Sequence, residues 1–154
     1  MKKTLFIVLV AVLIMPLVSC NKDDNNILST SFSAKIDGTS WNGDLVAAIH
    51  STDVNITTIT ATSTSGTNKI LLSFQGSGKG TYSFDNYNTG TVYSGSTLFS
   101  SEYLETPDGE IVITKYDESS NKISGTFSFT AMDFYGNSCT VSSGKFENVL
   151  LETY

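Results

Sequence analysis

The stretch ISGTFSFTA, residues 123–131, decides the fold class because its side chains alternate strictly in polarity. Ile, Gly, Phe, Phe and Ala occupy every second position, and Ser or Thr fills each position between them. A β-strand directs successive side chains to opposite faces, so this pattern predicts a strand with one buried and one solvated face. Antiparallel sheets commonly have such strands. The stretch therefore predicts an antiparallel all-β protein.

The segments on either side of this stretch keep the period of two. Upstream, residues 111–116 form a second alternating run, and the polar residues 117–121 between the two runs predict a hairpin. Downstream, YGN at 135–137 predicts a turn into the last strands of the chain. The apolar positions change parity near Gly144, which predicts a β-bulge there.

Shorter runs of the same kind fill the rest of the chain after residue 31. An Asp-Gly turn at 37–38 follows one run and predicts a hairpin. No window in this part shows a helical stripe. Together the runs predict an antiparallel meander that forms a β-sandwich or a flattened up-and-down barrel of about 8–10 strands, after a cleaved signal peptide. The further predicted strands are residues 32–36, 45–51, 54–65, 70–74, 81–84, 92–93 and 98–104.

Composition excludes several classes of protein. The 154 residues are enough for one domain. Fifteen Asp and Glu against nine Lys give a net charge of −6, whereas a nucleic-acid binder needs a basic surface to neutralise phosphates. One His and two Cys are too few for a Cys/His metal cluster or a disulfide framework. We therefore expect no metal, no cofactor and no nucleic-acid partner.

The N-terminus carries a secretion signal. Two lysines precede an apolar run, residues 4–19, that is shorter than the ~20 residues of a membrane-spanning helix. This pattern predicts a cleaved signal peptide. Its end, LVSC at 17–20, resembles the lipobox of bacterial lipoproteins. The resemblance implies cleavage between Ser19 and Cys20 and a lipid on the Cys20 thiol, which would attach the protein to a membrane.

The residues after Cys20 resemble the export signal of Bacteroidota surface lipoproteins, with Lys22 followed by Asp23 and Asp24. This resemblance implies contact with the lipoprotein-processing and export machinery, and an outer-membrane protein exposed at the cell surface. An anchor that faces the periplasm is the open alternative. The predicted organisation is a signal peptide at 1–19, a lipidated flexible tether at 20–31 and a single all-β domain at 32–154.

The body of the chain resembles a family of Bacteroidota lipoprotein domains of unknown function. The resemblance covers most of the chain after the tether and implies a single all-β domain. It implies no activity, because none of the matching residues is catalytic. The matching pieces are FSAKIDGTSW at 32–41, GTY at 80–82, residues 111–114 and 123–129, and SGKFENV at 143–149.

Residues with catalytic potential are few and poorly grouped. His50 is the single histidine, and no Gly-x-Ser-x-Gly motif offers it a nucleophile. Cys139 lies in a strand pattern, which predicts a buried, unreactive thiol. The carboxylate pairs Glu102 with Glu105 and Asp117 with Glu118 lie in polar turns or at strand ends and are interpreted as solvated. We therefore expect no enzyme and no catalytic residue.

Aromatic side chains are the best candidates for a binding site. Trp41, Tyr87 and Tyr93 are the predicted ligand contacts, because the region of Tyr87 and Tyr93 lies between weak strands rich in Gly and Ser. The expected function is a non-enzymatic binding or structural module. The alternative is a carbohydrate- or small-ligand-binding accessory protein of a nutrient-uptake system, whose partner would be a glycan or a surface protein.

Overall fold

The computed structural model describes residues 29–154 and confirms the all-β class. The predicted signal peptide, the lipid site at Cys20 and the export signal lie outside these residues. The described chain forms eleven strands and one short 3-10 helix, against the predicted 8–10 strands. They are β1 Ser31–Ile36, β2 Thr39–Asn42, β3 Leu45–Ser51, β4 Ile56–Thr62, β5 Asn68–Gln75, β6 Gly80–Ser83, β7 Thr89–Ser94, β8 Thr97–Ser100, η1 Ser101–Tyr103, β9 Gly109–Asp117, β10 Lys122–Met132 and β11 Ser138–Thr153.

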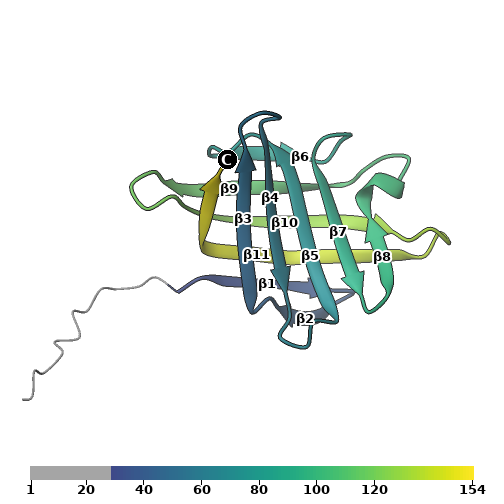
Figure 1. Ribbon diagram of the computed structural model, residues 1–154. Helices are drawn as coiled ribbons and strands as arrows, with labels where there is room; N and C mark the ends of the chain where they lie inside the picture. The colour runs from purple at the N-terminus through teal and green to yellow at the C-terminus, as the bar shows by residue number, and fades with distance from the viewer. Residues whose placement is uncertain (1–28) are drawn as a thin grey trace, which may run out of the picture.

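The strands form two layers that cross at a steep angle. In Figure 1, β3, β4, β5, β7 and β8 run across the front, and β1, β9, β10 and β11 run nearly perpendicular to them behind. Crossing of this kind is typical of orthogonal sheet packing. The strand order is β2-β1-β11-β3-β4-β5-β7-β8-β10-β9-β6, and β10 also pairs with β11. The sheet is therefore a partial ring and not a regular barrel.

The last strand, β11, joins the two layers. Most of its length pairs antiparallel with β1 and β10 in the rear layer. Its end turns to run parallel to β3, with Leu151 opposite Ala48. β6 also leaves its sequence neighbours and pairs with β9. The strand order therefore departs from the predicted meander at these points, and also where β1 pairs with β11 and β8 with β10, because pairing between distant segments leaves no trace in the period of either strand.

Two β-bulges bend β11. The first lies at Ser143, where φ is +51° and one residue of β10, Ser128, faces two of β11, Ser142 and Ser143. It confirms the bulge predicted at Gly144, one residue away. A Cβ atom on Gly144 would lie 2.5 Å from the Phe127 ring, so the close approach of β10 requires glycine. The second bulge, at Asn148, was not predicted; its N–H donates to Ser124 Oγ at 3.0 Å.

The core fills the space between the layers. The stretch that predicted the fold behaves as expected, since Phe127, Phe129 and Ala131 are buried while Thr126 and Ser128 face solvent. Phe146 is fully buried and stacks with Phe127 at a centroid separation of 6.3 Å. The largest fully buried side chains are Phe32, Phe74, Phe146, Ile59, Ile70, Leu72, Ile111, Ile113, Ile123, Val92, Val141 and Val149.

The predicted strand 98–104 is shorter in the structure. β8 ends at Ser100, and η1 follows at once, with the Ser100 hydroxyl accepting the Glu102 N–H at the start of the helix. This early end matters for the site, because it leaves η1 beside the β10–β11 loop. Among residues 29–154 there is no helix long and apolar enough to span a bilayer.

Candidate functional site

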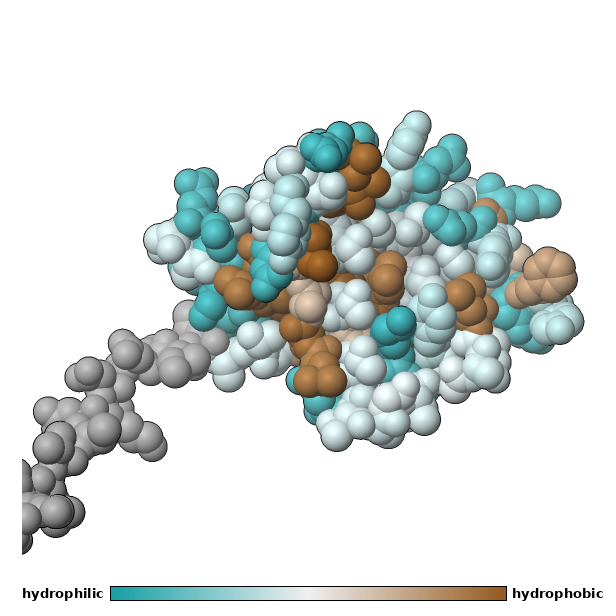
Figure 2. Space-filling view, in the orientation of Figure 1, coloured by the Kyte–Doolittle hydropathy of each residue, from teal (hydrophilic) through white to brown (hydrophobic). Residues whose placement is uncertain are grey.

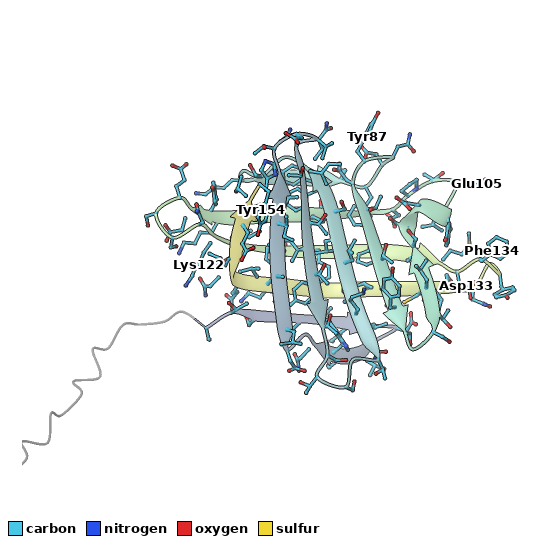
Figure 3. The ribbon with its side chains drawn as sticks, viewed as in Figure 1. Tyr87, Glu105, Lys122, Asp133, Phe134 and Tyr154 are labelled. Atoms are coloured by element: carbon cyan, nitrogen blue, oxygen red, sulfur yellow. The ribbon has the colours of Figure 1, made fainter. Side chains whose placement is uncertain are left out.

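The three predicted ligand contacts do not lie on one surface. Trp41 is only 8% exposed and packs edge-on against Phe32 at 5.9 Å, as part of the core. Tyr93 is half-buried on β7, with Lys69 Nζ 4.3 Å from the centre of its ring. Tyr87 is 64% exposed in the β6–β7 loop and points away from the body in Figure 3. Tyr87 and Tyr93 lie at opposite ends of β7.

The most exposed aromatic rings are instead at the turn between β10 and β11. Phe134 and Tyr135 are each 87% exposed, and their rings stand nearly perpendicular, 83° apart, at a centroid distance of 5.9 Å. Figure 3 shows Phe134 projecting from the edge of the molecule, and Figure 2 shows apolar colour at the same edge. We call residues 133–137 the aromatic tip.

Asp133 holds the aromatic tip in one shape. Its Oδ1 accepts the backbone N–H groups of Tyr135 at 2.9 Å and Asn137 at 2.8 Å, and its Oδ2 accepts the Asn137 side-chain amide at 2.8 Å. The Asp133 N–H donates to the Asn137 carbonyl. The bond from the Asn137 side chain holds the pKa of Asp133 below its usual value, because it favours the charged carboxylate. The rings are thus displayed by a preorganised turn.

A hollow of about 410 Å³ lies beside the aromatic tip. We call it the tip hollow. It opens where β8 and β10 separate after pairing at a single position, Ser100 with Met132. One serine, one threonine, three aromatic residues, one leucine and the tip aspartate surround it. The lining residues are Ser96, Thr97, Leu98, Tyr103, Asp133, Phe134 and Tyr135.

The edge of β8 offers backbone hydrogen-bonding groups to the tip hollow. β7 and β8 form a hairpin with a two-residue loop at 95–96, and the flanking pair, on either side of this loop, is Ser94 with Thr97. In such two-residue hairpins the flanking pair is hydrogen-bonded and the next pair, here Tyr93 with Leu98, is not. The N–H and C=O of Leu98 therefore point away from β7, toward the tip hollow that Leu98 lines.

A second hollow offers a ligand less. It has a volume of about 360 Å³ and lies over β9, β10 and β11, beside the bulge at Ser143. Glu110, Lys145 and several hydroxyls line it, and its single aromatic residue, Phe127, is buried. The tip hollow is the better candidate because its aromatic rings are exposed.

His50 belongs to the internal hydrogen-bond network of the front layer. The side chain is buried, and its Nδ1 lies 3.0 Å from Thr57 Oγ1. The Thr57 hydroxyl donates a hydrogen bond to the Gly76 carbonyl. A hydroxyl has one proton, so it must accept from His50, and the imidazole therefore carries a proton on Nδ1. His50 links β3 and β4 to the loop after β5.

Cys139 is a free thiol inside the core. Burial, together with the charge of nearby Asp37, raises the pKa of this thiol to about 11. The thiolate is the reactive form of cysteine, and at neutral pH the thiol is almost entirely protonated. The burial of Cys139 confirms that part of the prediction, and the raised pKa favours the predicted low reactivity.

The carboxylates considered as catalytic pairs serve turns or face solvent. Asp117 Oδ1 accepts the N–H and the hydroxyl of Ser119, which holds the pKa of Asp117 below its usual value and stabilises the β9–β10 turn. Glu102 and Glu105 are exposed and line an open hollow with Asp85. Within residues 29–154 no three His, Cys, Asp or Glu side chains are grouped to hold a metal ion.

Comparison with known proteins places the chain in a family. The sequence pattern of a domain of unknown function, DUF6252, matches residues 29–150, which span nearly all of the described strands. The chain belongs to this family. No curated protein and no solved structure matches the DUF6252 chain.

The sequence interpretation missed the aromatic tip of the DUF6252 domain. It treated Tyr135 as a turn residue only and gave Phe134 no role. A signal was present: two adjacent aromatics between an aspartate and Gly136-Asn137. Asp and Asn hydrogen-bond to nearby backbone groups in turns, so this order of residues indicates a tight turn whose central side chains have no core to enter.

The pKa of Asp133 predicts that acid will loosen the aromatic tip. A pKa held below 3.8 means that the carboxylate stabilises the turn above pH 3.8 and that this effect is lost as the pH falls through the lowered pKa. We expect the Tyr135 and Asn137 amides to lose protection from hydrogen exchange in that range, before the core amides. In Asp133→Ala they should exchange fast at neutral pH. An Asp117→Ala control should leave them protected; equal exchange in both variants would contradict the role of Asp133.

Proposed function

We propose that this protein is a lipid-anchored outer-membrane protein, exposed at the cell surface, whose β domain is a non-enzymatic binding module. The observation that carries the binding role is the aromatic tip. Monomeric proteins seldom expose neighbouring large aromatic side chains without a use for them, and aromatic residues are enriched where proteins bind partners. Asp133 fixes the turn before any partner arrives, which lowers the entropy lost on binding.

The position of the aromatic tip supports the same proposal. The described chain starts beside β11, where Ser31 faces Glu147 and Thr30 donates to the Asn148 carbonyl at 3.1 Å. At about 3.3 Å per residue, the part of β11 from Ser138 to Glu147 spans about 30 Å. Figure 1 accordingly shows the β10–β11 turn at the opposite side of the domain from the start of β1. A lipid on Cys20 would therefore attach the domain at the end far from the aromatic tip.

The absence of enzymatic activity is also part of the proposal. It is supported by the places of the two side chains best suited to catalysis. His50 is hydrogen-bonded to Thr57 inside the domain, and Cys139 is buried with a raised pKa. Neither residue lines the tip hollow.

The anchor and its direction can be tested in the producing bacterium. We expect the full chain to take up radiolabelled palmitate and to be cut when intact cells are treated with protease. Cys20→Ala should abolish the label. The triple variant Lys22→Ala, Asp23→Ala, Asp24→Ala should keep the label but become protected from protease. Continued processing and labelling of Cys20→Ala would overturn the anchor, and protection of the unaltered chain would place the protein on the periplasmic side.

The binding role can be tested by photo-crosslinking in the same cells. A benzophenone amino acid replaces Tyr135 in one strain and Tyr87 in another, since both tyrosines are exposed and only one belongs to the aromatic tip. We expect a discrete adduct, of whatever chemical nature, from position 135 and none from position 87. Equal labelling at both positions, or none at 135, would contradict the proposal.

A further inference from the structure

We propose that the tip hollow is a binding site for a neutral carbohydrate. This inference rests on the proposed binding function and names the class of ligand. Three features of the hollow carry it: exposed aromatic rings, short hydroxyl and backbone groups between them, and the lack of a charge free to pair with a ligand. Each feature matches a property of sugars.

The rings provide a surface for the apolar face of a sugar. One face of a pyranose ring presents several C–H groups, which pack well against the electron-rich face of an aromatic ring. Tyr103, from η1, is 45% exposed and lines the tip hollow together with Phe134 and Tyr135. Phe134 and Tyr135 stand nearly perpendicular, so the two rings offer surfaces in two directions. A volume of about 410 Å³ is within the usual range for small-ligand sites.

Polar groups line the hollow opposite the aromatic tip. The hydroxyls of Ser96 and Thr97 can each donate and accept a hydrogen bond, as sugar hydroxyls do. The outward N–H and C=O of Leu98 add one fixed donor and one fixed acceptor on the edge of β8. The open edge is short, because β8 ends at Ser100, so it offers few groups to an extended peptide and enough for a ligand with many hydroxyls.

The electrostatics favour a neutral ligand. No lysine lines the tip hollow, and acidic residues outnumber lysines in the chain by fifteen to nine, which disfavours an anionic ligand. Asp133 is the one carboxylate in the lining, and both of its oxygens already accept hydrogen bonds from the turn. It therefore has little capacity left to pair with a cationic ligand.

The test is a binding screen with the chain from residue 20 onward, carrying Cys20→Ala so that no lipid is added. The probes are immobilised neutral oligosaccharides, acidic oligosaccharides and extended peptides. We expect binding to neutral oligosaccharides, with an affinity that does not change between low and high salt. The double variant Phe134→Ala, Tyr135→Ala removes two of the three rings and should bind at least about tenfold more weakly. This corresponds to a loss of about 1.4 kcal/mol of binding free energy.

Matched variants keep the test specific. Tyr87→Ala removes an exposed tyrosine outside the hollow and should bind like the unaltered chain. Thr97→Val keeps the shape of the side chain but removes the hydroxyl, and should weaken binding while leaving the unfolding temperature unchanged. Because Phe134 and Tyr135 are so exposed, the double variant should also keep its unfolding temperature.

Each remaining outcome overturns the inference in a recognisable way. Failure to bind any neutral oligosaccharide removes the carbohydrate site, while a crosslink at position 135 would still support the binding module. Selective binding of peptides or acidic oligosaccharides through the aromatic tip replaces the ligand class and keeps the module. Oligosaccharide binding that the double variant leaves unchanged places the site elsewhere on the domain.

Discussion

Phe146→Ala is expected to lower the free energy of unfolding by about 3–5 kcal/mol, the usual cost of removing a large buried aromatic side chain. Phe146 lies on β11 with no exposed surface, and its ring stacks with those of Phe32 at 6.2 Å and Phe127 at 6.3 Å. The backbone around it is fixed by strands on both sides, so the cavity left by the ring has little freedom to collapse. Urea denaturation would measure this loss. The slope of the unfolding free energy against urea concentration should be the same as for the unaltered chain.

Phe134→Ala is the matched control for this substitution. It removes the same side chain from a position that is 87% exposed, so the free energy of unfolding should change by less than about 0.5 kcal/mol. A loss at position 134 as large as that at 146 would mean that the aromatic tip is packed on the domain and not displayed. A small loss at 146 would contradict its central place in the core.

Gly125→Ala is expected to cost about 3 kcal/mol, the upper end of the range for overpacking a tight core. A Cβ atom at position 125 would overlap the Val112 carbonyl oxygen and lie 2.6 Å from the Phe146 ring. The ring could turn, but the carbonyl belongs to β9, which is paired with β10 on the same side. The two strands would have to separate locally. Thermal and urea unfolding of the single variant would show the effect.

Gly78→Ala is the control for Gly125→Ala, because a Cβ atom there meets nothing within 4 Å. It should be neutral or slightly stabilising, since alanine restricts the unfolded chain. Combining Gly125→Ala with Phe146→Leu should recover only part of the loss, as the contact with the Val112 carbonyl remains. Full recovery would mean that the ring alone excludes a side chain at 125.

Local features of the fold could be predicted from sequence because they depend on neighbouring residues. The hairpin of β9 and β10 followed from two alternating runs around a polar turn, and the bulge near Gly144 followed from a change of parity within one strand. The parallel pairing of β11 with β3 could not be predicted in this way. In this pairing Leu151 lies opposite Ala48. The residues next to each of them in the sequence follow the same kind of pattern as those of an antiparallel strand.

The candidate site was harder to predict because exposure depends on tertiary position. Trp41 is a residue type that often contacts ligands, yet β2 directs its side chain into the core, where it packs against Phe32. Phe134 would be buried in almost any strand, and it is exposed only because the Asp133 turn carries it past the end of β10. The tip hollow itself exists because β8 and β10 share one pair and then diverge, which no local pattern reveals.

The partial ring of strands makes folding depend on the last strand to be synthesised. β1, near the start of the described chain, pairs with β11, and the end of β11 is also what joins β3 to the rear layer. A growing chain that lacks residues 138–153 has no β11, so one edge of β1 and one edge of β3 stay unpaired until the last strand appears. Contacts between such distant segments slow folding. We therefore expect the domain to complete its fold only once β11 is available, and its early strands to be prone to aggregation until then.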